Sequence, residues 1–93
     1  MTYRLLPWTT PEGNPCYLST DGGPDSLMSR VADDIEAAQL ASGTQVLAGA
    51  RAVLGDQKAG ERALRFALAR AVESLEEVLR VAVSRGGRAA GGS

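Results

Sequence analysis

The sequence predicts a mainly α-helical protein in which a short N-terminal β-hairpin or extended segment precedes a long antiparallel helical hairpin. Three observations support this prediction. All four prolines lie within residues 1–25, where they interrupt any helix. Apolar residues then recur at steps of three and four over residues 26–54 and again over 60–84, as they do along one side of an α-helix. A short polar connection separates the two runs, and such connections place consecutive helices side by side.

The N-terminal segment is expected to form two strands, over residues 4–9 and 16–19, with a turn at 11–14. Pro7 cannot donate a hydrogen bond to the ladder, so the first strand should be an edge strand or merely extended chain. A lone hairpin is marginally stable in water, and its large apolar side chains should therefore lie against the helices. The alternative is that they form an exposed patch that binds a protein partner. The side chains concerned are Leu6, Trp8, Tyr17 and Leu18.

The first helix is expected over residues 26–54, with Asp25 or Ser26 placed to cap its N-terminus. The apolar pattern keeps its phase through Gly43, which favours one continuous helix, although a break with Gly43 as a C-terminal cap remains an alternative. Three carboxylates near the helix start suit the helix dipole and are expected to be solvated. They are Asp33, Asp34 and Glu36.

This first helix carries two apolar stripes, which indicates two neighbours. The first stripe comprises Met28, Val31, Ile35, Ala38, Ser42, Val46, Gly49 and Val53. The second comprises Leu40, Leu47 and Leu54, at seven-residue spacing. One neighbour should be the second helix, and the other the N-terminal segment or a second copy of the chain.

The second helix, over residues 60–84, has a single leading stripe that should face a partner helix. The stripe comprises Leu64, Leu68, Ala71, Leu75, Val78 and Ala82. Phe66 lies off this stripe and is a candidate for a dimer contact or for the core under the N-terminal segment. The glycine-rich residues 85–93 are expected to be a flexible tail, so residues 1–84 form the single domain.

Two helices cannot cover three apolar stripes, and a symmetric second copy is the commonest solution. We therefore expect a homodimer that forms a four-helix bundle. Its interface should include Leu40, Leu47, Leu54 and Phe66.

The composition argues against several classes of function. The net charge is -1 and there is no histidine, so neither a basic field for nucleic acid nor a neutral-pH acid-base group is present. One cysteine, Cys16, cannot form a disulfide within the chain, which favours a reducing compartment. No run approaches the ~20 apolar residues that span a bilayer, and no leader pattern opens the chain. We expect a cytoplasmic, non-enzymatic protein without metal or cofactor.

The run LLPWTTPEGNPCYLST, followed by SRVADDIEAAQL, resembles small uncharacterised actinomycete proteins with a tryptophan, a PCYL-like element and a long helical remainder. Such proteins are often encoded near helix-turn-helix regulators. The resemblance implies an accessory role in gene regulation or development.

These observations favour a protein-interaction or regulatory adaptor that acts as a small helical dimer. One alternative is a nucleic-acid-binding regulator that uses the arginines of the second helix and the tail. Those arginines are Arg62, Arg65, Arg70, Arg85 and Arg88. Another alternative is a small-ligand-binding bundle with a pocket between the helices and the hairpin.

Overall fold

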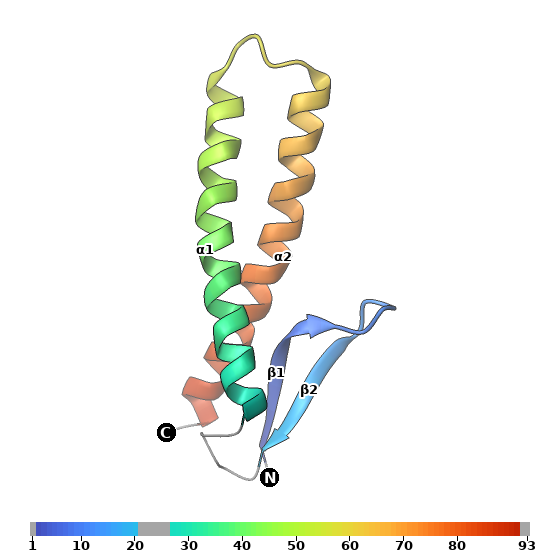
Figure 1. Cartoon of the computed structure of the whole chain (residues 1–93), viewed down its shortest axis with the longest axis vertical. Coiled ribbons are helices and arrows are strands. Elements are labelled where there is room, and N and C mark those ends of the chain that lie inside the picture. Colours follow the sequence, from blue (N-terminus) through green and yellow to red (C-terminus); the bar gives the residue numbers. More distant parts are fainter. Residues whose placement is uncertain (1, 21–26, 92–93) are drawn as a thin grey trace.

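The computed structural model describes residues 2–20 and 27–91, with side chains described for residues 3–19 and 27–86. Its elements are β1 (Thr2–Thr9), β2 (Pro15–Thr20), α1 (Leu27–Gly55) and α2 (Glu61–Gly91). The two helices run antiparallel, and the β-hairpin lies beside the end of the helices where both chain ends are found (Figure 1). The predicted order of a hairpin followed by two long helices is confirmed.

The hairpin closes through a tight turn that the sequence predicted. The N–H of Thr10 donates to the carbonyl of Asn14 at 2.9 Å, and the N–H of Gly13 donates to the carbonyl of Thr10 at 2.8 Å. Gly13 has a φ of 86°, a conformation that residues with a Cβ rarely adopt. The N–H of Asn14 also donates to the Thr10 hydroxyl at 3.0 Å, so polar groups of the turn form hydrogen bonds with one another.

Strand β1 departs from regular pairing around Pro7. Leu5 pairs with Tyr17 and Thr9 with Pro15, so Leu6, Pro7 and Trp8 lie opposite one residue of β2. Since Pro7 has no N–H, a regular ladder would lack a donor there, and the irregularity removes that requirement. The carbonyl of Pro7 instead accepts from Gln39 Nε2 at 2.9 Å, which joins the irregular segment to α1.

Helix α1 is continuous over 29 residues and passes through Gly43 without a break. This confirms the prediction of one helix, and the alternative with a cap at Gly43 is excluded. The proposed N-terminal cap at Asp25 or Ser26 lies outside the described residues.

The connection between the helices is held by its own aspartate. Asp56 Oδ1 accepts from the N–H of Lys58 at 2.9 Å, and the Asp56 carbonyl accepts from the N–H of Ala59 at 3.0 Å. An aspartate side chain that bonds the backbone two residues on is a common turn device. It reverses the chain within a few residues and sets α2 antiparallel to α1.

Helix α2 extends to Gly91, seven residues beyond the end that the sequence predicts. Each glycine in a helix costs about 1 kcal/mol relative to alanine. Adding residues to an existing helix is nevertheless much easier than starting one, and the alanines and arginines between the glycines are good helix formers.

The contact between α1 and α2 is closest at small side chains, which corrects the predicted orientation of α2. A Cβ added at Gly43 would lie 3.3 Å from Ser74 Oγ and from Val78 Cγ2, so the helices approach closely there. The less exposed positions near this contact are Gln39, Leu40, Gly43, Val46 and Ala50 on α1, and Ala67, Ala71, Ser74, Val78 and Val81 on α2. The predicted stripe of α2 meets this contact only in part: Ala71 and Val78 lie at it, whereas Leu68 and Leu75 are exposed.

Alanine substitutions at two glycines of α1 should separate helix propensity from packing. Gly49→Ala should raise the free energy of unfolding by about 0.5–1 kcal/mol, because a Cβ there meets nothing within 4 Å. Gly43→Ala should gain clearly less, because its Cβ presses on Ser74 and Val78. Urea unfolding followed by circular dichroism measures both, and equal gains would contradict the close helix approach at Gly43.

The chain is extended rather than spherical, with extents of 54 × 27 × 21 Å. Its radius of gyration is 16.4 Å, whereas a compact domain of this length would have about 12 Å. No other described element covers the half of the two helices next to their connection (Figure 1). The aliphatic core of the described residues accordingly consists of Leu6, Ala32 and Val81.

Candidate interaction surfaces

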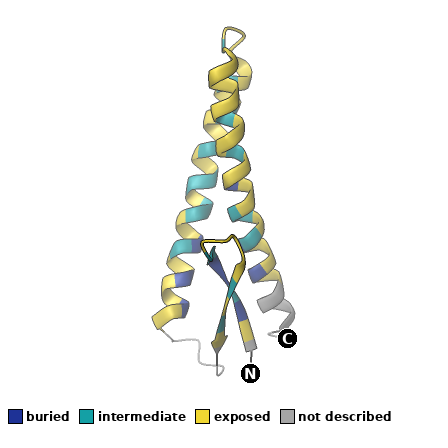
Figure 2. Cartoon of the chain, turned by 90° about the vertical axis from the view of Figure 1, so that its right-hand side faces the viewer, coloured by how far each residue is buried: buried dark blue, intermediate teal, exposed yellow. Residues whose placement is uncertain are grey.

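Large apolar side chains of both helices lie on one side of the helical hairpin, and we call this set the leucine face. It combines the second predicted stripe of α1 with the predicted stripe of α2. Its large side chains are Leu40, Leu47 and Leu54 from α1, and Leu64, Leu68, Leu75 and Val78 from α2. Leu47, Leu68 and Leu75 are 50%, 66% and 58% exposed. Figure 2 shows the helices largely exposed along the half that the hairpin does not reach.

A hollow of about 350 Å³ lies in the leucine face, between the two helices. Its lining contains no charged side chain: Leu40, Gly43, Thr44, Val46, Leu47, Ser74, Leu75 and Val78. A surface of this kind is costly to leave in water, because each buried Å² of apolar area is worth about 25 cal/mol.

Phe66 belongs to a different surface, on the other side of the contact between the helices. Phe66 precedes Leu75 by nine residues, which is about 180° around a helix. It borders a second hollow of about 350 Å³ with Gly49, Val53 and Arg70. The four residues predicted for one dimer interface are therefore divided between two faces, and a single flat contact does not reach all of them.

A third surface lies where the hairpin meets α2. An open hollow of about 420 Å³ is bordered by Leu5 and Tyr17 from the hairpin and by Leu79 and Val83 from α2. Pro15, Glu76 and Arg80 complete its lining. This hollow, which we call the hairpin groove, is apolar at its centre and carries one charge of each sign.

The four hairpin residues predicted to contact the helices or a partner have different environments. Leu6 is a core side chain, 6% exposed, and it is not available to a partner. Trp8 and Leu18 are half-buried. Tyr17 is 60% exposed and borders the hairpin groove, so it is the member of the set best placed to meet another protein.

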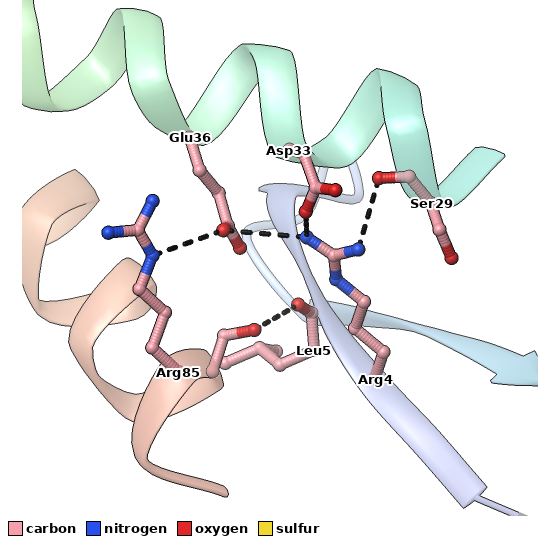
Figure 3. A network of polar contacts seen from close by, with 7 residues as sticks. Arg4, Leu5, Ser29, Asp33, Glu36 and Arg85 are labelled. Atoms are coloured by element: carbon pink, nitrogen blue, oxygen red, sulfur yellow. Dashed lines mark hydrogen bonds and ion pairs between the residues drawn. The ribbon is translucent and has the colours of Figure 1, made fainter. Parts of the chain in front are cut away.

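A buried ion cluster ties the hairpin to both helices (Figure 3). Arg4 of β1 donates to the carbonyl of Ser29 at 3.0 Å and to Asp33 Oδ1 at 2.6 Å. Its guanidinium also lies 3.4 Å from Glu36 Oε1, and Arg85 Nε of α2 lies 3.6 Å from the same oxygen. Arg4 is 8% and Glu36 is 1% exposed, so both charges are removed from water and depend on these partners.

The prediction that Glu36 is solvated is wrong. The position of Glu36 on the helical wheel of α1 indicates its burial. Glu36 lies four residues after Ala32 and seven before Gly43, so it shares the side of α1 that contacts the rest of the chain. The cluster itself was missed because the cation that pairs with Glu36 comes from a strand distant in sequence. The opposite charges of the cluster hold β1, α1 and α2 together. The Ser84 hydroxyl adds a hydrogen bond by donating to the Leu5 carbonyl at 2.9 Å.

The arginines proposed for nucleic-acid binding are mostly engaged with acidic neighbours. Arg65 pairs with Glu61 at 3.1 Å and Arg70 with Glu73 at 2.8 Å. Arg85 lies beside Glu36, and Arg88 lies in the part of α2 whose side chains are not described. This pairing reduces the positive charge that α2 offers to a phosphate backbone.

The described residues offer neither a cluster of metal ligands nor a membrane span. No group of three or more metal-ligating side chains occurs among them. Within the same residues, neither helix offers a stretch with the length and hydropathy of a membrane span.

The fold and its surfaces define the chain as an antiparallel helical hairpin braced at one end by a β-hairpin. Comparison of the chain with protein-family models, with curated proteins and with solved structures found no match in any of the three.

Proposed function

We propose that this protein is a non-enzymatic protein-interaction adaptor that acts in the cytoplasm as a small homodimer, accessory to a regulator of transcription. The observation that supports the proposal is the outward orientation of its large apolar side chains. Leu54, Phe66 and Leu68 are 79%, 68% and 66% exposed, although the chain has few large side chains in its core. Exposed apolar surface on this scale is typical of proteins that bind other proteins.

Two separate surfaces suit an adaptor better than one. The leucine face lies along the helices, and the hairpin groove lies between the β-hairpin and α2. A protein that dimerises through one of them keeps the other free for a second protein. Tyr17 beside the hairpin groove offers a large amphipathic ring, the kind of side chain that often dominates binding energy at interfaces.

Tyr17→Ala should reduce capture of a partner protein at least about tenfold without unfolding the helices, since losing an aromatic anchor commonly costs more than 1 kcal/mol of binding. The measurement is quantitative affinity capture from a lysate of the source cells, with circular dichroism of the purified variant. Tyr17 is mainly exposed, so its loss should leave the fold intact.

Tyr3→Ala is the matched control. Tyr3 is 66% exposed and lies on the same hairpin, but it does not border the hairpin groove. If wild type and both variants retain a partner equally, the hairpin groove is not the surface that binds it. Wild-type protein that captures no partner at all would contradict the adaptor function.

A further inference from the structure

We propose that the leucine face binds the leucine face of a second copy of this chain, and that the Phe66 surface and the hairpin groove stay outside this contact. The inference rests on the dimer of the proposed function and assigns its interface. Three observations support it: the spacing of the leucines, the charges that border the three hollows, and the accessible area of the whole chain.

The leucines have the spacing of a helix-helix seam. Leu40, Leu47 and Leu54 repeat at seven residues along α1. On α2, the stripe that runs from Leu64 to Ala82 alternates steps of four and three residues. A seven-residue apolar repeat is the pattern by which helices supercoil around one another in bundles. Ala71 and Val78 of this stripe lie at the contact between α1 and α2, but Leu68 and Leu75 are exposed, so a partner for these leucines must come from elsewhere.

The three surfaces differ in the charges that border their hollows. A two-fold interface brings a surface against itself, so a charge near its centre meets the same charge of the other copy. The hollow of the leucine face has no charged residue in its lining, whereas Arg70 borders the Phe66 hollow. Glu76 and Arg80 border the hairpin groove. The hollow of the leucine face can thus meet its own copy without bringing like charges of its lining together.

The accessible area matches what a stable homodimer buries. The chain exposes 6770 Å², whereas a folded monomer of 9.7 kDa would expose about 5,100 Å². The excess is about 1,650 Å², and obligate homodimers bury about 1,000–2,500 Å² on each subunit. The chain's own hairpin does not supply this cover, because Arg4 and Gln39 fix β1 at its present place.

Arginine substitutions on the two faces test the assignment. Leu47→Arg and Leu68→Arg should each weaken dimerisation at least about 100-fold, because each change occurs twice in a symmetric interface and buries an unpaired charge. Phe66→Arg should leave the dimer within about threefold of wild type. All three side chains are at least half exposed in the single chain, so the substitutions do not disturb its core. Sedimentation equilibrium over a range of concentrations measures the dimer, and circular dichroism measures the helix content.

The outcomes separate this inference from the proposed function. A dimer that survives Leu47→Arg and Leu68→Arg but is lost in Phe66→Arg would overturn the inference and leave the homodimer standing. Wild-type protein that is monomeric at all concentrations would overturn both. If Leu47→Arg loses helix, recovery at high protein concentration supports the inference, and a loss that does not depend on concentration overturns it.

Discussion

Replacing Arg4 by methionine is expected to lower the free energy of unfolding by about 3 kcal/mol. Methionine keeps much of the side-chain volume but removes the charge that faces Glu36 and Asp33, and Glu36 is 1% exposed. The remaining cation, Arg85, lies 3.6 Å from Glu36 and is half exposed, so it cannot replace Arg4. Urea unfolding followed by circular dichroism at matched protein concentration measures the loss.

Two further variants show whether the loss comes from the buried charge. Arg65→Met removes an exposed ion pair with Glu61 and should cost less than about 0.5 kcal/mol. Adding Glu36→Met to Arg4→Met should recover most of the stability, since replacing both members of a buried pair by apolar groups is often neutral. Equal losses in Arg4→Met and Arg65→Met would contradict the structural role of the cluster.

The parts of the fold that depend on neighbouring residues were predictable. The turn around Gly13 and the continuity of α1 both follow from short-range patterns. The disturbed strand pairing at Pro7 also follows from the sequence, because a residue without an N–H interrupts the hydrogen-bond ladder of any strand. The local pattern did not predict which contacts the irregular segment makes with the helices. The register change accompanies the burial of Leu6 and the bond from Gln39 to the Pro7 carbonyl.

The orientation of the helices was not predictable from periodicity alone. The spacing of Leu64, Leu68 and Leu75 predicts that they share a face, and they do, but it does not say which neighbour that face meets. The structure brings Gly43 against Ser74 and Val78 instead, because small residues let the helices approach closely. The candidate surfaces could not be predicted for the same reason. Periodicity shows which leucines share a face, but whether that face is exposed depends on tertiary packing.

Leu6→Ala is expected to lower the free energy of unfolding by about 2–4 kcal/mol, a large effect for one residue of a hairpin. Leu6 is 6% exposed and lies in the irregular segment that packs on the helices, so its loss leaves a cavity where β1 is held. The neighbouring Trp8 is half-buried and is the only tryptophan of the chain. Its fluorescence therefore reports on the hairpin separately from the helices, which dominate circular dichroism at 222 nm.

The two signals distinguish local from global loss. If the hairpin is held by Leu6 together with the Arg4 cluster, Trp8 emission in Leu6→Ala should shift to the red at lower urea than the helix signal is lost. Leu27→Ala is the control, because Leu27 is 77% exposed and its truncation should cost less than about 0.5 kcal/mol. A variant Leu6→Ala with the stability and Trp8 emission of wild type would mean that polar contacts fix the hairpin without Leu6. These contacts are the ion cluster, the bond from Gln39 to the Pro7 carbonyl and the bond from Ser84 to the Leu5 carbonyl.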